Sequence, residues 1–92
     1  MTTAYCTSVY DNSAYGDGGG IVNHGTGTLT ITDSEVHHNR AHNQGGGGIQ
    51  NDLYATLAII NCSFHHNDAD SGGGGIHNNG RLTIADSSVF HN

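Results

Sequence analysis

GGGGIQN at residues 45–51 and GGGGIHN at 72–78 are two copies of one motif, and GDGGGIVN at 16–23 is a third. Each copy is a glycine run followed by isoleucine, one variable residue and asparagine. The isoleucines of successive copies are 28 and 27 residues apart. A recurring period of this length is typical of repeat proteins, in which each repeat packs on its neighbours.

The residues between the motifs also recur, and they form apolar rows and asparagine rows. An alternating apolar pair follows each motif, then a single large apolar residue, and three residues later an asparagine. The apolar rows are Ile21, Ile49 and Ile76; Leu29, Leu57 and Leu82 with Ile31, Ile59 and Ile84; and Val9, Val36, Phe64 and Val89. The asparagine rows are Asn12, Asn39, Asn67 and Asn92, and the shorter Asn23, Asn51 and Asn78. We expect the apolar rows to form the core and the asparagines to form hydrogen-bonded ladders.

Each repeat is predicted to contain three short strands. The segments GIVN, TLTIT and SEVHH of the first full repeat alternate in polarity and are rich in β-branched residues, which is a strand pattern. Strands at a fixed period predict an all-β parallel β-helix, a single-stranded solenoid of about three coils spaced about 4.8 Å apart. The predicted domain is one segment, 1–92, with a partial coil 1–17 and coils 18–44, 45–71 and 72–92.

The glycine runs are interpreted as tight corners. Glycine reaches positive φ and lets two backbones approach closely, so a glycine run can turn sharply and stack on its neighbours. A phosphate-binding loop is the functional alternative, but it needs a helix N-terminus after the glycines. Here IQN and IHN are predicted to open strands.

The pattern GGGGI-x-N…L-x-I-x-x-S-x-F-x-x-N-x-A resembles the right-handed parallel β-helix repeat of polymorphic outer-membrane proteins and related bacterial surface proteins of the pectate-lyase-like superfold. The resemblance covers nearly the whole chain. It implies a right-handed β-helix and a location at the cell surface or outside the cell. That superfold carries lyases, epimerases, hydrolases, adhesins and autotransporter passenger domains, so the fold does not choose among these functions.

Charge and hydropathy exclude several classes of partner. The formal net charge is −6, and Arg40 and Arg81 are the only basic side chains apart from histidine. Nucleic-acid binding and contact with anionic membranes both need a basic surface, so neither is predicted. The longest apolar runs are too short to insert into a bilayer, and the N-terminus shows no signal peptide.

Histidine supplies the candidate metal ligands. The segments VHHN and FHHN are expected to place His37 over His65 and His38 over His66, with His91 continuing the second column. Paired imidazoles one strand spacing apart could hold Zn²⁺, Ni²⁺ or Cu²⁺. The alternative is an exposed polar ladder with no ligand. In either case stacked imidazoles repel when charged, which predicts a loss of stability below about pH 6.

No catalytic residue and no cofactor are predicted. Cys6 and Cys62 are expected two coils apart, beyond the roughly 7 Å that a disulfide allows between Cα atoms, so both are predicted to be free thiols, with intermolecular bridging as the alternative. Lysine is absent, and the two arginines are expected to share no cluster with paired carboxylates. About three coils span only roughly 16 Å, which is too short for the long groove that a polysaccharide enzyme of this fold usually presents.

The sequence therefore predicts a non-enzymatic surface or secreted β-helix module, an adhesin-type or passenger-type scaffold that binds a carbohydrate polymer or another protein. The alternative is a segment of a carbohydrate-active enzyme of the pectate-lyase-like kind. A β-helix leaves unpaired strands at its two ends. We therefore expect the chain to be a fragment of a longer solenoid or to associate with itself through those ends.

Overall fold

The computed structural model describes residues 2–5, 7–16 and 18–92, and within them the chain is all-β. The strands are β1 (Thr2–Tyr5), β2 (Ser8–Tyr10), β3 (Ser13–Ala14), β4 (Ile21–Asn23), β5 (Thr28–Thr32), β6 (Glu35–His37), β7 (Arg40–Gln44), β8 (Ile49–Asn51), β9 (Thr56–Ile60), β10 (Ser63–His65), β11 (Asp68–Ser71), β12 (Ile76–Asn78), β13 (Arg81–Ala85) and β14 (Ser88–Phe90). No helix that could cross a membrane occurs in these ranges.

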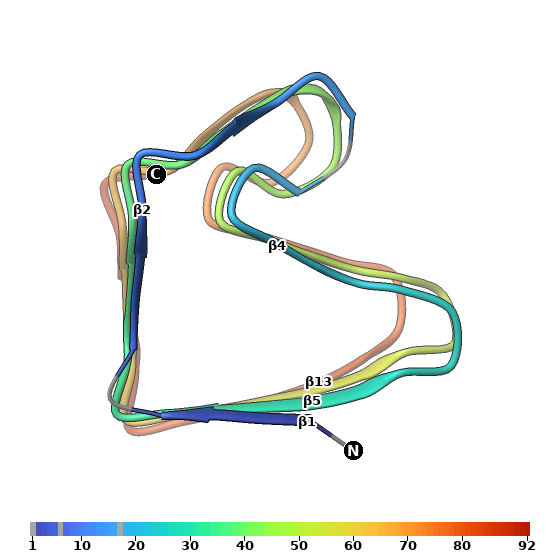
Figure 1. Ribbon diagram of the computed structural model, residues 1–92, viewed down its shortest axis with the longest axis vertical. Helices are drawn as coiled ribbons and strands as arrows, with labels where there is room; N and C mark the ends of the chain where they lie inside the picture. The colour runs from blue at the N-terminus through green and yellow to red at the C-terminus, as the bar shows by residue number, and fades with distance from the viewer. Residues whose placement is uncertain (1, 6, 17) are drawn as a thin grey trace.

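The strands form four parallel sheets, and each sheet takes one strand from each of three or four successive repeats. Their orders are β1-β5-β9-β13, β14-β10-β6-β2, β11-β7-β3 and β12-β8-β4. The chain passes through the four sheets in the same sequence in every repeat, and successive repeats superpose when viewed along the shortest axis of the molecule (Figure 1). That axis measures 16 Å, against 27 Å and 25 Å for the other two.

Each full repeat contains four strands, so the prediction of three was wrong. The additional strand of the first full repeat is β7, with the sequence RAHNQ. This segment has no β-branched or aromatic residue, which is why its composition did not indicate a strand. It is extended because it pairs with β3 on one side and β11 on the other.

Equivalent residues of successive repeats are aligned without a shift in the sheets that carry the core. Leu29 pairs with Leu57, and Leu57 with Leu82. Val36 likewise lies between Val9 and Phe64. The buried apolar cluster consists of Leu29, Ile31, Val36, Ile49, Leu57, Ile59, Cys62 and Phe64, with Val9, Ile21, Ile76 and Leu82 packed against it. The core therefore runs along the stacking direction, inside the four sheets.

A ladder of asparagine side chains closes one corner. The Oδ1 atom of Asn67 accepts hydrogen bonds from the backbone N–H and the Nδ2 of Asn39, at 3.1 and 3.0 Å. The Nδ2 of Asn67 donates to Oδ1 of Asn92 and to the carbonyl oxygen of Val36, both at 3.0 Å. Asn12 donates to Asn39 in the same way. Each internal amide thus uses both donors and accepts twice, which satisfies buried polar groups that the turn would otherwise leave unpaired.

The second asparagine row also forms a ladder. Asn23 Nδ2 donates to Asn51 Oδ1 at 2.8 Å, and Asn51 Nδ2 donates to Asn78 Oδ1 at 2.7 Å. The same nitrogens reach backbone carbonyls of the following strands, those of Thr56 and Arg81. This ladder joins the end of β4 to the start of β9 and the end of β8 to the start of β13, so it ties each repeat to the following one.

The glycine runs form corners because their backbones approach the neighbouring repeat. Ile21 N–H donates to the carbonyl of Gly48 at 2.9 Å, and Ile49 N–H donates to that of Gly75 at 2.9 Å. Among the described glycines of the three runs, positive φ occurs at Gly18 and Gly45. Both expected reasons for glycine therefore apply, positive φ at two positions and close backbone approach along the runs.

Replacing Gly47 by alanine is expected to lower the free energy of unfolding by about 1–3 kcal/mol, because overpacking an ordered backbone is costly. A Cβ at this position would lie 2.3 Å from the carbonyl oxygen of Gly74 and 2.4 Å from that of Asp68. Gly16→Ala is the matched control, since a Cβ there meets nothing within 4 Å. Urea denaturation of both variants measures the difference, and equal midpoints would contradict the close-packed corner.

Candidate functional site: the histidine face

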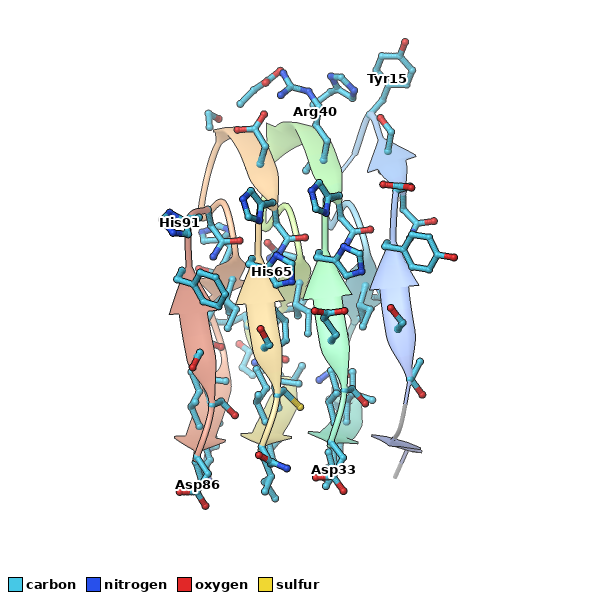
Figure 2. The ribbon with its side chains drawn as sticks, turned by 90° about the vertical axis from the view of Figure 1, so that its left-hand side faces the viewer. Tyr15, Asp33, Arg40, His65, Asp86 and His91 are labelled. Atoms are coloured by element: carbon cyan, nitrogen blue, oxygen red, sulfur yellow. The ribbon has the colours of Figure 1, made fainter. Side chains whose placement is uncertain are left out.

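The largest group of ionisable side chains lies on the outer side of the sheet β14-β10-β6-β2 and on the corner that follows it. We define the histidine face as the outward residues of this sheet and the corner residues after them: Ser8, Tyr10, Asp11, Glu35, His37, His38, Ser63, His65, His66, Ser88, Phe90 and His91. Figure 2 looks onto this face, with His65 and His91 labelled.

Two columns of stacked rings run along the histidine face. In the first, Tyr10, His37, His65 and Phe90 follow one another with centroids 5.2, 5.0 and 5.3 Å apart and nearly parallel planes. In the second, His38, His66 and His91 are 4.9 and 5.7 Å apart. The structure thus brings the four candidate ligands His37, His38, His65 and His66 together. The stacking follows from the parallel register, which repeats each side chain at the strand spacing.

The second column depends on an unusual backbone conformation. His38, His66 and His91 have φ of 56°, 54° and 52°, in the left-handed region. Most residues with a Cβ avoid this region, although His, Asn and Asp enter it more often than others. The left-handed residue turns the chain between the sheet and the asparagine ladder, so two consecutive histidines both point outward. Asp11 occupies the equivalent position in the first repeat, with φ of 57°.

Within each repeat the two histidines meet through the same ring atom. His37 Nδ1 lies 2.7 Å from His38 Nδ1, and His65 Nδ1 lies 2.8 Å from His66 Nδ1. The rings of each pair are nearly perpendicular, at 85° and 87°. One nitrogen of a close pair must donate and the other accept, so each pair shares one Nδ1 proton.

Glu35 connects the two pairs. Its Oε2 accepts a hydrogen bond from His65 Nε2 at 2.8 Å, and its Oε1 lies 3.4 Å from His37 Nε2. A neutral imidazole carries one ring proton. When a carboxylate keeps that proton on Nε2, Nδ1 has no proton and can only accept a hydrogen bond. His65 Nδ1 is then the acceptor of its pair and His66 Nδ1 the donor. The hydrogen bond from His65 is also the largest cause of the lowered pKa of Glu35.

The pKa of His66 lies below its usual value of 6.5, first because of desolvation and then because of the neighbouring His38, His65 and His91. The folded state therefore favours the neutral ring. The contribution of neutral His66 to the free energy of unfolding is fully present above the unfolded-state pKa of 6.5. It is lost as the pH falls through the lower folded-state pKa.

The melting temperature is accordingly expected to fall between pH 8 and pH 5 in buffer containing a chelator. The groups around His66 are the imidazoles of His37, His38, His65 and His91, whose mutual repulsion grows on protonation. His66→Asn, which suits the left-handed backbone, is expected to reduce the fall. Calorimetry across this range checks the prediction, and a constant melting temperature would contradict it.

A second polar cluster lies on the adjacent sheet β11-β7-β3. Arg40 forms ion pairs with Asp68 and, at 2.5 Å, with Asp70 of the next repeat. His42 Nδ1 is 3.9 Å from Asp70 Oδ2, and its Nε2 is 2.9 Å from Ser13 Oγ. The expectation that Arg40 shares no cluster with paired carboxylates was wrong, because position 40 of one repeat pairs with position 68 of the next. These side chains are about half exposed, so their contribution to stability is small.

The other candidate residues are placed as follows. Cys62 is a free and buried thiol, and its Sγ lies 3.2 Å from the carbonyl oxygen of Ile60. Cys6 lies outside the described residues.

Within the described ranges no pocket is formed, and no group of three or more His, Cys, Asp or Glu side chains is arranged around a common metal position. Sequence reasoning found the histidine columns but missed the Nδ1 contacts and the position of Glu35.

Comparison of the chain with protein-family models, with curated proteins and with solved structures gave no match.

Proposed function

We propose that the chain is a right-handed parallel β-helix module that acts as a non-enzymatic scaffold and binds an extended carbohydrate polymer through its histidine face. Four parallel sheets visited in a constant order support the β-helix. The repeat motif, by its resemblance to bacterial surface proteins, supports right-handedness and a location at the cell surface or outside the cell.

The observation that carries the proposal is the regular spacing of the histidine face. Rings recur every 5.0 to 5.3 Å in the first column. Ser8, Glu35, Ser63 and Ser88 form a parallel row of hydroxyl and carboxylate groups on the same strands. Tyr10 and Phe90, at the two ends of the ring column, are 55% and 42% exposed. Apolar rings beside hydrogen-bonding groups match the mixed polarity of a sugar, and the periodic spacing suits a repeating polymer.

Affinity electrophoresis through gels that contain a soluble β-glucan, a galactomannan or a xylan tests this function. We expect retardation by at least one neutral polysaccharide, and weaker retardation of a Tyr10→Ala/Phe90→Ala variant. Tyr54→Ala is the matched control, because Tyr54 is 74% exposed and lies outside the histidine face. Unchanged migration in all three gels would overturn polymer binding. Release of new sugar ends in the presence of Ca²⁺ would instead support the carbohydrate-active enzyme.

We further propose that copies of the module stack end to end. The last strand of each four-membered sheet, β13 or β14, pairs on one side only. The apolar rows continue there into side chains that are partly exposed: Ile84 is 44% and Val89 46% exposed. A second copy offers the matching surface, since Val9 begins the row that Val89 ends. Each asparagine of the ladder donates to the asparagine of the following repeat. In an end-to-end stack, Asn92 of one copy would therefore donate to Asn12 of the next.

Val89→Asp is expected to shift the chain from oligomer to monomer, because it places a charge in the apolar contact between two copies. Analytical ultracentrifugation at micromolar concentration measures the shift. Leu53→Asp is the control, since Leu53 is 62% exposed and lies in the turn between β8 and β9, two strands with a neighbour on each side. Wild-type protein that sediments as a folded monomer would contradict end-to-end stacking while leaving polymer binding untouched.

A further inference from the structure

We infer that each consecutive histidine pair, His37/His38 and His65/His66, chelates a divalent late transition-metal ion through its two Nδ1 atoms, with Cu²⁺ preferred over Ni²⁺ and Zn²⁺. The inference is independent of the proposed polymer binding. It requires two protein ligands at each ion, with the remaining positions taken by water.

The first argument is that the two Nδ1 atoms of each pair already converge. They are 2.7 and 2.8 Å apart. The left-handed backbone at His38 and His66 creates this convergence, because it turns the second ring toward the first. The last repeat provides an internal contrast. There Phe90 replaces the first histidine, so His91 meets a ring without a nitrogen at a centroid distance of 5.3 Å.

The second argument is the carboxylate behind the rings. Metal-binding histidines commonly donate the other ring N–H to a carboxylate, which fixes the tautomer and raises the basicity of the ligating nitrogen. Glu35 does this for His65 Nε2 at 2.8 Å and lies 3.4 Å from His37 Nε2. One carboxylate therefore serves both pairs, and it is the only glutamate of the chain.

The third argument concerns the metal. With metal–nitrogen bonds of about 2.0–2.1 Å, two nitrogens at these separations subtend an angle of roughly 85° at the ion. This is close to the right angle of square-planar and tetragonal complexes, which Cu²⁺ and Ni²⁺ favour, and far from the tetrahedral angle of Zn²⁺ sites. The usual affinity order of divalent ions also places Cu²⁺ first.

The proton balance is simple. In the free pair His66 Nδ1 carries the shared proton and donates it to His65 Nδ1. When the ion binds, two nitrogen–metal bonds form, the Nδ1–H bond breaks, and the proton moves through water to His66 Nε2. Both rings stay neutral, so no net proton is released when the rings start neutral.

The two sites interact because they are neighbours. The rings of the two pairs stack at 5.0 and 4.9 Å, so two bound ions would lie about one strand spacing apart. Like charges at that distance repel. We therefore expect the first Cu²⁺ to bind more tightly than the second, and to prefer His65/His66, where the contact with Glu35 is shorter.

Titration of the whole chain with CuCl₂ at pH 7.5, followed by electron paramagnetic resonance and calorimetry, tests the site. We expect the first Cu²⁺ to show two imidazole nitrogens as ligands. Replacing all four paired histidines by asparagine is expected to weaken its binding at least tenfold, because both sites are then removed, and Glu35→Gln is expected to weaken it about tenfold. The control is His24→Asn/His42→Asn, which removes two histidines outside the pairs and leaves any amine-terminal site intact. Circular dichroism confirms that each variant is folded.

A second readout uses the wild-type chain alone. Substoichiometric Cu²⁺ should broaden the ring resonances of the four paired histidines before those of His24, His42 and His77. Equal broadening of all histidines, or the same Cu²⁺ affinity in the variant without the four paired histidines as in the control, would overturn chelation by the pairs. Binding of Zn²⁺ as tight as that of Cu²⁺ would overturn the right-angled geometry.

Discussion

Phe64→Ala is expected to lower the free energy of unfolding by about 3–5 kcal/mol, the usual cost of removing a buried aromatic ring. Phe64 has no exposed surface and is the largest fully buried side chain among the described residues. It lies between Val36 and Val89 in its row, and both are smaller. The neighbouring repeats are tied by backbone hydrogen bonds, so they cannot move together to fill the cavity.

Guanidinium denaturation of Phe64→Ala measures this cost, and Tyr54→Ala provides the comparison. Tyr54 is an aromatic residue with 74% of its surface exposed, so its removal is expected to change stability by less than about 0.5 kcal/mol. A Phe64→Ala variant as stable as Tyr54→Ala would show that the ring is not in the core.

Asn67→Ala is expected to cost about 3 kcal/mol, although it removes only a small polar group. Four hydrogen bonds of the side chain disappear, two accepted from Asn39 and one donated to each of Asn92 and Val36. The partners on Asn39 are buried, and each buried group left unpaired costs about 1–3 kcal/mol. Water that reaches the corner can compensate for part of the loss.

Asn79→Ala is the matched control for the ladder. Asn79 is exposed, and its backbone N–H donates a hydrogen bond to the carbonyl oxygen of Asn51 at 2.9 Å, which alanine retains. Chemical denaturation of the two variants should therefore give clearly separated midpoints. If Asn67→Ala were no less stable than Asn79→Ala, the asparagine column could not be holding the corner.

The repeat allowed much of this fold to be predicted from the residues. Once Ile21, Ile49 and Ile76 are aligned, the other apolar rows and the asparagines fall into columns at steps of 25 to 28 residues. Parallel pairing between equivalent segments then buries the apolar rows together. A strand-like sequence pattern that recurs in every repeat is stronger evidence than a single copy, which is why strands of only three residues could be recognised.

The features that escaped prediction depend on backbone conformation and not on side-chain pattern. The strand Arg40–Gln44 has no strand-forming composition and is extended by pairing alone. The left-handed conformation of His38 and His66 has no signature in single residues, although histidine tolerates it. Without that conformation, consecutive histidines would be expected on opposite sides of a strand, and their Nδ1 contact could not be foreseen.

The central claim is that equivalent residues of successive repeats lie one above another and are joined by backbone hydrogen bonds. Scalar couplings across hydrogen bonds, measured by nuclear magnetic resonance, test it directly. The structure predicts couplings from the amide nitrogen of Arg40 to the carbonyl carbon of Asn12, and from that of Asp68 to that of Asn39, across bonds of 2.8 Å. Couplings that instead join residues of one repeat, or that pair neighbouring strands in antiparallel order, would contradict the account.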